Sequence, residues 1–451
     1  MTLWFISPSS PTGNNRLIEL AGIDLWMGLC TNRVFVYPSD LNTDQFKYAL
    51  SRTLSLCPLV AGRFLLLEND HYFIKMSDNP IPVTYIENTE LAAWPTELNV
   101  ISDQHKNYLA PFIDEIQTLK LIYGSQEEPL LRLKLTCLKQ SGEWILGVSW
   151  AHVLGDGGAS SKFLNALSHF YQNLDPVKPL PVFERRLWRE DEADQSLLPM
   201  MKYLAHAGLS KDKYKLCSHW EDIYEQLNLS FSGKQLAKLR ELAGGNNVTI
   251  QDSLSAYICL TLNTHCYLND AQRNIRRINT YVNFRGISDA IAPAGVIANT
   301  IFLMPSDDFD DGISLSHIAK TIRQSILRSR NPKFMEPCLA TADVLMRRNA
   351  RENFRACGQF PNEMIVNSNL RFDWASLVDF GYTDKCRCYA PRTSPLFLRV
   401  YRLNPIKNGS EWLPRDRDGA EVAFGIEKEL KERFLCAWQK DVAENFSNIH
   451  Y

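Results

Sequence analysis

Apolar positions along the chain alternate between the spacing of helices and that of strands. Residues 43–57 place an apolar side chain about every fourth position and end at Pro58, which predicts an amphipathic helix that stops at the proline. Apolar and polar residues alternate over 131–137, and a turn at 140–142 leads into the uniformly apolar residues 144–150. The pattern therefore predicts a hairpin of a half-buried and a more fully buried strand.

A glycine-rich segment, HVLGDGGASS, follows the second of these strands, and residues 163–174 then resume helical spacing. The expected unit is strand, tight turn, helix. It places His152 at the end of a strand and Asp156 in the turn that starts a helix. Functional side chains gather at such ends, so these two residues are the first candidates for a site.

The middle of the chain changes character. Residues 176–181 include three prolines, and the charged stretch ERRLWREDEAD follows, so residues 175–225 are predicted to form an exposed connection. Beyond it, Ser232-x-x-Gln235 has the form of a capping box for a helix that stops at Gly244-Gly245, and helical spacing resumes over 250–266. We expect mixed α and β halves at 1–180 and 226–451, joined by a linker or crossover at 181–225.

Composition and charge narrow the possible functions. The 451 residues are 45% hydrophobic and 22% charged, as in a globular protein with a large core. Lysine plus arginine (49) against aspartate plus glutamate (51) gives a net charge of −2, so the charge balance argues against a nucleic-acid partner. No apolar run is long enough for a membrane span, and the first residues lack the pattern of a signal peptide, so a cytoplasmic location is expected.

The cysteines predict neither a disulfide framework nor a metal centre. Eleven of them, an odd number, are scattered from Cys30 to Cys436, which is typical of reduced thiols. Cys386 and Cys388 are the one close pair. Further ligands at suitable spacing are missing from the nearby sequence, so no metal site is expected.

His152 and its neighbours suggest proton transfer. A histidine with a pKa near neutrality can take a proton from a hydroxyl or an amine, and a carboxylate close in sequence can fix the turn and the ring. Gly155, Gly157 and Gly158 allow the backbone to turn sharply and to approach a ligand. A histidine at a strand end is more often structural, however, so the spacing alone leaves both interpretations open.

Several segments together resemble a known family. The text SWAHVLGDG at 149–157 resembles the HxxxDG signature of the coenzyme A-dependent acyltransferase superfamily, and is most similar to its BAHD branch. Further similar stretches occur in the family's order along the chain: 23–64, 249–258, 281–286 and, for the DFGWG signature, 378–389. Tyr382 and Thr383 depart from that second signature. Ala151 stands where the related condensation domains carry the first histidine of HHxxxDG.

This resemblance implies a mixed α/β fold like that of chloramphenicol acetyltransferase. Two similar domains, each a mixed β-sheet covered by helices, would enclose an interdomain active-site channel. The implied reaction transfers an acyl group from an acyl-CoA co-substrate to a hydroxyl or amine of a small-molecule acceptor. His152 would be the general base, with no covalent acyl-enzyme, no bound cofactor and no metal. The protein is expected to be a monomer.

The resemblance also implies roles for particular residues. Asp156 would orient the site by pairing with Arg285, the alternative being that Arg285 is a solvated surface residue. Ser368, if it is not simply a turn residue, would donate to the oxyanion. The residues expected to bind the substrates are Gly157, Ser253, Ser255, Asp379, Phe380, Gly381 and the basic stretch 273–277. The residues expected to line an acceptor pocket are Trp26, Phe35, Phe372 and Trp374.

Two other functions remain open at this point. The chain could be a condensation-type enzyme that takes its donor from a carrier protein. It could also be a catalytically idle member of the fold that only binds other molecules. The intact His152, Asp156 and Gly157 argue against an idle member.

Overall fold

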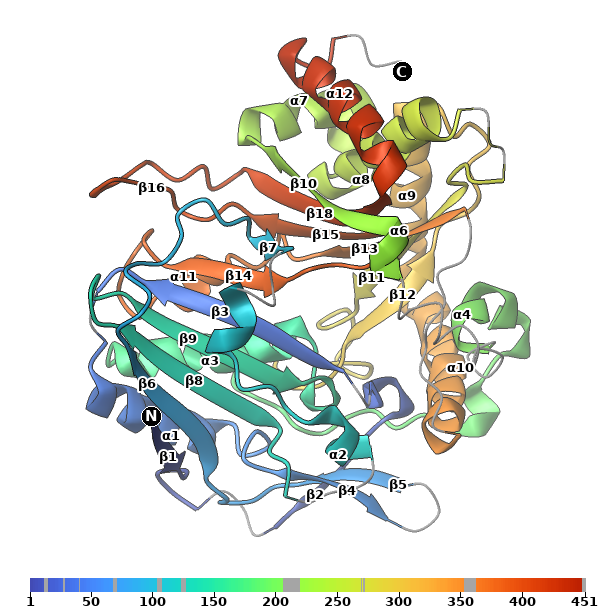
Figure 1. Cartoon of the computed structure of the whole chain (residues 1–451). Coiled ribbons are helices and arrows are strands. Elements are labelled where there is room, and N and C mark those ends of the chain that lie inside the picture. The colour runs from blue at the N-terminus through green and yellow to red at the C-terminus, as the bar shows by residue number, and fades with distance from the viewer. Residues whose placement is uncertain are drawn as a thin grey trace.

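Two large β-sheets form the framework of the computed structural model (Figure 1). The structure describes residues 1–447 except 12–14, 27–28, 40, 68–70, 104–107, 123–126, 206–219, 269, 271 and 353–361. The seven strands of the first sheet are, in spatial order, β1 (Thr2–Ile6), β6 (Ile81–Asn88), β8 (Leu131–Leu138), β9 (Trp144–Ala151), β3 (Cys30–Tyr37), β14 (Arg387–Pro391) and β7 (Ile101–Ser102). The six of the second sheet are β10 (Tyr224–Phe231), β18 (Ala420–Glu427), β15 (Phe397–Arg402), β13 (Glu363–Ser368), β11 (Arg277–Asn283) and β12 (Ile301–Pro305).

Both sheets are mixed, and two small sheets accompany them. Strands β6 and β8 are parallel in the first sheet, as are β11 and β13 in the second, while most other pairs are antiparallel. The small sheets consist of β2 (Leu17–Glu19), β4 (Arg63–Leu67) and β5 (His71–Lys75), and of β16 (Lys407–Asn408) and β17 (Glu411–Trp412).

Helices cover the sheets. They are α1 (Thr43–Leu56), α2 (Thr118–Ile122), α3 (Gly157–Tyr171), α4 (Lys202–Ala205), α6 (Trp220–Ile223), α7 (Gly233–Ala243), α8 (Ile250–Thr261), α9 (Leu315–Ser329), α10 (Pro332–Arg351), α11 (Trp374–Leu377) and α12 (Lys428–Ala443). Helices α1 and α3 lie side by side against the first sheet, and α7, α8, α9 and α12 pack with the second (Figure 1). Within the described part of the chain, no helix is both long and apolar enough to cross a bilayer.

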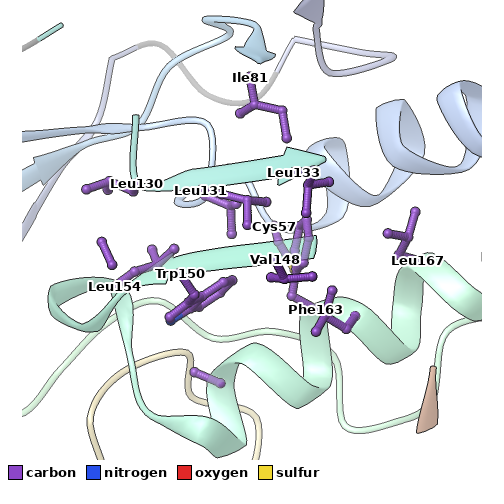
Figure 2. Packing of buried hydrophobic residues seen from close by; sticks show 14 of the residues in the cluster. Cys57, Ile81, Leu130, Leu131, Leu133, Val148, Trp150, Leu154, Phe163 and Leu167 are labelled. Carbon is purple, nitrogen blue, oxygen red and sulfur yellow. The ribbon is translucent and has the colours of Figure 1, made fainter. Parts of the chain in front are cut away.

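The predicted hairpin is confirmed as β8 and β9, an antiparallel pair that carries the first core. Leu131 and Leu133 of β8, Val148 of β9 and Phe163 of α3 gather in one cluster of buried side chains, as Figure 2 shows. The predicted helix that follows is confirmed as α3. Because this helix packs on the strand that precedes it, the turn between them is held from both sides.

The capping box is confirmed at α7. The side chain of Ser232 accepts from the backbone N–H of Gln235 at 3.2 Å, and the side-chain oxygen of Gln235 accepts from the backbone N–H of Ser232 at 2.7 Å. Gly244 ends the helix with a φ of 138°, a region that favours glycine. The next predicted helix is α8, which ends earlier than expected, at Thr261, before a π-helical turn at Leu262–Cys266.

The chain does not divide between the sheets at a single point. Strand β14, from the second half, pairs with β3 of the first sheet, and Trp374, Val378 and Phe380 belong to the first core.

The charged stretch near residue 185 is not an exposed connection throughout, as the sequence led us to expect. The side chain of Arg185 is 2% exposed because it pairs with Asp24, and Trp188 is 8% exposed. Residues 206–219 of the predicted linker lie outside the described residues.

Candidate active site

A cavity of about 550 Å³ lies where strands of both halves approach each other. The first half supplies residues of β3, together with His152, Gly157 and Gly158. The second half supplies residues of β11, β13 and β15 and the segments that follow β13 and β14. No carboxylate occurs among the described residues that line the cavity. Five arginines do line it: Arg33, Arg330, Arg371, Arg392 and Arg399. The cavity is therefore suited to a ligand with negative charge.

His152 enters this cavity at the end of β9, where a 3₁₀ turn spans His152–Leu154. Its backbone is fixed on both sides. The N–H donates to the carbonyl oxygen of Leu29 at 3.0 Å, and its carbonyl oxygen accepts from the Asn299 side chain at 2.8 Å. The ring centroid lies 5.8 Å from that of Trp26, one of the aromatics expected around the acceptor.

The surroundings of His152 disfavour the charged form of its ring. Burial lowers its pKa below the ordinary value, because a charged imidazolium is poorly solvated there, and the charge of Asp156 opposes this effect. Nδ1 is buried and has no hydrogen-bond partner among the described residues. A neutral imidazole is the form of histidine that can accept a proton.

Asp156 stabilises the turn and the start of α3, and it makes no hydrogen bond to His152. It caps α3 by accepting from the N–H of Ala159 at 2.9 Å. Its other oxygen accepts from the N–H and the hydroxyl of Thr300, at 2.8 and 2.9 Å. Burial alone would raise its pKa, but the charge of Arg285 and these hydrogen bonds bring the pKa below the ordinary value.

The structure brings Arg285 to Asp156, so Arg285 is not a solvated surface residue. Its Nη2 donates to Asp156 Oδ1 at 2.9 Å and to the Ala298 carbonyl at 3.0 Å, with 7% of the side chain exposed. Gly158 makes this approach possible, because a Cβ at that position would overlap Arg285 Nη1. The pair joins the start of α3 to the second half of the chain.

Ser368 lies at the end of β13 and lines the cavity. Its Oγ accepts from the N–H of Leu370 at 3.3 Å, which leaves its own proton available to donate. The neighbouring Asn369 also lines the cavity, and its side-chain oxygen accepts from Trp374 Nε1 at 3.3 Å.

The residues expected to contact coenzyme A lie elsewhere. Ser253 is fully buried in α8 and donates back to the Thr249 carbonyl at 2.9 Å. Ser255 is 1% exposed and accepts from Gln251, which is the residue of this helix that lines the cavity. Both serines are therefore buried and lie outside the cavity lining.

The basic stretch 273–277 is also occupied, since two of its arginines have ion-pair partners. Arg273 pairs with Glu427 at 2.7 Å, and Arg277 pairs with Asp308 at 2.7 Å. The cavity lining includes no residue of this stretch.

The DFG-like segment packs away from the cavity. Phe380 is 3% exposed, with its ring centroid 5.2 Å from that of Tyr37 and 5.0 Å from that of Tyr171. Asp379 Oδ1 accepts from the N–H of Gly381 at 2.9 Å and from the Gln172 amide at 3.3 Å. The motif therefore anchors a loop of the second half on the first core.

The aromatic residues predicted around the acceptor differ in position: one lines the cavity and others are buried in the core. Phe372 lines the cavity, Phe35 is fully buried in the first core, and Trp374 is 3% exposed beneath an arginine. Cys386 and Cys388 are buried free thiols, and no metal-binding cluster occurs among the described residues.

Two residues of the site were not singled out in the sequence. Asn299, besides holding His152, donates its backbone N–H to Asp24 at 2.8 Å, and its contacts join residues far apart in the chain. Arg33 lines the cavity at 5% exposure. The sequence did contain one signal for Arg33. It is a charged residue directly before the apolar segment VFVY of the same strand, and it lies on the same face of that strand as Thr31.

Comparisons with known proteins agree with this geometry. The model of the Transferase family matches residues 2–397. Protein ECERIFERUM 2 of Arabidopsis thaliana is 27% identical over 190 residues, which is 39% of this chain and 43% of that protein. The chain thus matches less than half the length of this curated relative.

Solved structures share the fold at low identity. The F. graminearum TRI101 structure with ethyl coenzyme A has a TM-score of 0.64 at 15% identity, covering 94% of this chain and 98% of that chain. Vinorine synthase has a TM-score of 0.63 at 15% identity, covering 96% and 95%. The condensation domain of the Monacolin K polyketide synthase MokA has a TM-score of 0.58 at 12% identity, covering 96% and 98%.

These likenesses confirm the predicted two-domain fold of coenzyme A-dependent acyltransferases. Since the family model covers most of the chain, from β1 to the start of β15, this protein belongs to the Transferase family, the BAHD-type acyltransferases.

Proposed function

We propose that this protein transfers an acyl group from an acyl-CoA thioester to a hydroxyl or amine of a small molecule, with His152 as general base. The observation that carries the proposal is His152 itself. It lines the cavity shared by both halves, its backbone is fixed at two points, and burial lowers its pKa. A neutral, rigidly placed imidazole is what proton removal from an acceptor requires.

The reaction follows from this position. His152 takes the proton from the acceptor as its oxygen or nitrogen attacks the thioester carbonyl. The tetrahedral oxyanion then collapses, the bond to sulfur breaks, and the imidazolium returns the proton to the departing thiolate. The acyl group passes directly to the acceptor, so no bond to the protein forms.

The oxyanion of this reaction needs a donor, and Ser368 fits that requirement. Its hydroxyl lies on the cavity wall and its proton is not used by the hydrogen bond from Leu370. A placed donor in a cavity with little water stabilises a developing negative charge by several kcal/mol, about 3–4 in well-studied cases.

The phosphates of coenzyme A would meet Arg330 and Arg371. Both side chains line the cavity and are exposed, and neither pairs with a carboxylate among the described residues. Arg371 is also held against the ring of Phe372, with its guanidinium 4.4 Å from the centroid. Exposed cations at a cavity rim attract a phosphate without the cost of a buried charge.

The test is acyl transfer by the full chain. Acyl-CoA esters of different acyl groups are incubated with panels of alcohols and amines, and thiol release and acylated product are both measured. His152→Ala should reduce transfer by about 10²–10⁴-fold in a protein with unchanged melting temperature. His169→Ala is the matched control, because that histidine lies on α3 and donates to the Asp175 carbonyl at 2.7 Å.

Three outcomes would contradict the proposal. Full transfer activity in a folded His152→Ala variant would show that His152 is not the general base. Transfer only from a pantetheine thioester on a carrier protein would instead favour a condensation-type enzyme, whose fold is similar. Binding of acyl-CoA with no transfer to any acceptor would favour an idle binding member.

A further inference from the structure

Arg33 is a buried cation at the wall of the cavity. It lies on β3, is 5% exposed, and lines the cavity together with His152. Its guanidinium stacks on Trp374, 3.8 Å from the ring centroid. One nitrogen, Nη1, donates to Ser160 Oγ at 3.4 Å, a long hydrogen bond to a neutral group.

Arg33 has no carboxylate partner in the described part of the chain, and neither its Nε nor its Nη2 donates to any residue there. Other buried arginines behave differently. Four with side chains no more than 7% exposed each face a carboxylate: Arg185, Arg285, Arg387 and Arg415. A buried charge without a counterion is costly, so Arg33, unlike these four, is suited to pair with an anion from outside the chain.

These two nitrogens form one edge of the guanidinium, in which Nε is buried and Nη2 lies beside Gly157. The geometry of this edge matches the two oxygens of a carboxylate. The same protein shows the arrangement at Arg132, whose Nε and Nη2 donate to the two oxygens of Glu128 at 2.9 and 3.1 Å. Such paired charge-assisted hydrogen bonds are about twice as strong as neutral ones. Stacking on Trp374 holds the fork of Arg33 in place before any ligand arrives.

Gly157 leaves room beside this fork. A Cβ at that position would stand 3.6 Å from Arg33 Nη2 and 3.9 Å from Asn369 Oδ1, so a longer side chain would fill the space at the guanidinium. His152 is five residues earlier, and the charge of Arg33 is close enough to affect its pKa. The open space therefore adjoins the reacting centre.

We propose that Arg33 binds a carboxylate of the substrate and so selects anionic substrates for this active site. The inference rests on the proposed acyl transfer. The carboxylate belongs to one of two molecules: a hydroxy or amino acid that accepts the acyl group, or the acyl group of a dicarboxylic acid monothioester. The phosphates of coenzyme A are excluded here, since the neutral pantetheine arm separates them from the thioester.

The test measures binding by calorimetry, so it does not depend on turnover. One arm compares succinyl-CoA with butyryl-CoA, and the other compares 4-hydroxybenzoate with 4-hydroxybenzamide in the presence of coenzyme A. We expect one arm to favour the carboxylate by about tenfold or more in the unaltered protein. Arg33→Met should abolish that preference and leave the affinity for the neutral probe nearly unchanged.

Control variants keep the test decisive. Arg392→Met removes another cavity arginine, one that already pairs with Glu221 at 3.1 Å, and should leave the preference unchanged. Arg33→Lys keeps the charge without the fork and should give an intermediate preference, and it serves if the methionine variant does not fold.

The outcomes separate this inference from the proposed function. No preference for either carboxylate, or a preference that survives both Arg33 variants, would overturn the role of Arg33 even if acyl transfer proceeds. A uniform fall in transfer of all substrates would also overturn it, because Arg33 would then serve the transition state. A carboxylate preference that depends on Arg33 without any transfer would support the binding site while contradicting the reaction.

Discussion

Individual side chains at the site are held by partners that are distant in sequence. Asp156 accepts four hydrogen bonds, from Ala159, Arg285 and twice from Thr300, and none of them comes from His152. His152 is instead held through its backbone by Asn299. The pairing of Asp156 with Arg285 followed from the resemblance to a family. The role of Asn299 could not be predicted, because nothing in the sequence around it resembles a motif.

The pairing of Asp156 and Arg285 is testable by a double-mutant cycle. Asp156→Ala and Arg285→Ala should each lower the free energy of unfolding by about 3–5 kcal/mol, because each leaves a buried charge without its partner. The double variant should lose less than the sum, with a coupling of about 1–3 kcal/mol. Denaturant unfolding measures all four proteins. Strictly additive losses would show that the two charges do not interact.

The pH dependence of transfer reports on His152. Burial lowers the pKa of His152 from its ordinary value of 6.5, so the acidic limb of kcat/KM should lie below that pH. The charge of Arg33 also lowers this pKa, whereas the charge of Asp156 raises it. Arg33→Met should therefore move the limb to higher pH, and Asp156→Asn should move it to lower pH. Shifts in the opposite directions would place the titrating group elsewhere.

Elements were predicted well where the signals were local. The capping box of α7 and the alternation in β8 each belong to a short stretch of sequence, and both were confirmed. The serines of α8 were misread, because a helix buried on nearly all sides offers no face to a ligand, and burial of that kind depends on α7 and α9 packing around it. Short strand β14 could not be paired with β3 from the sequence, since more than 300 residues separate them.

The DFG-like segment is an anchoring element, and its residues should differ in importance. Phe380→Ala should lower the free energy of unfolding by about 3–5 kcal/mol, since the ring fills a space among Tyr37, Phe46 and Tyr171. Asp379→Asn should cost only about 1 kcal/mol, because an amide oxygen can still accept from Gly381. The pH profile of transfer should keep its acidic limb in both variants that remain folded. A displaced limb in Asp379→Asn would make Asp379 part of the proton transfer.

Across the whole molecule, buried carboxylates tie one half of the chain to the other. Asp156 reaches Arg285, Glu143 reaches Arg387 at 2.5 Å, and the N–H groups of Gly22 and Ile23 donate to Asp343 of α10. The cavity lies between halves joined in this way. Its walls are therefore held in register by charged groups that a sequence-based division into two domains does not reveal.

Glu421 is one of these connections, and it links stability to pH. Its carboxylate on β18 accepts from the N–H groups of Val100 and Ile101, both at 2.8 Å, and from the Asn228 amide at 2.9 Å. Burial outweighs these hydrogen bonds and raises the pKa of Glu421 to about 7, above the ordinary 4.5. Between these two pH values, Glu421 is therefore mostly protonated in the folded protein and mostly ionised in the unfolded chain.

This difference predicts how stability changes with pH. The contribution of Glu421 is fully present below the ordinary pKa and is lost as pH rises through about 7, since ionisation of the buried carboxyl is penalised only in the folded state. Each unit of pKa difference is worth about 1.4 kcal/mol, so a loss of a few kcal/mol should appear in the free energy of unfolding.

The variant Glu421→Gln tests this dependence. Its glutamine side chain cannot ionise, and it presents an amide N–H group to the backbone donors. It should therefore be less stable at low pH and should lose less stability as pH rises. Denaturant unfolding between about pH 5 and pH 8 compares it with Glu432→Gln, an exposed control on α12. Parallel stability curves for the unaltered protein and Glu421→Gln would show that Glu421 is ionised throughout and binds the two halves together as a charge.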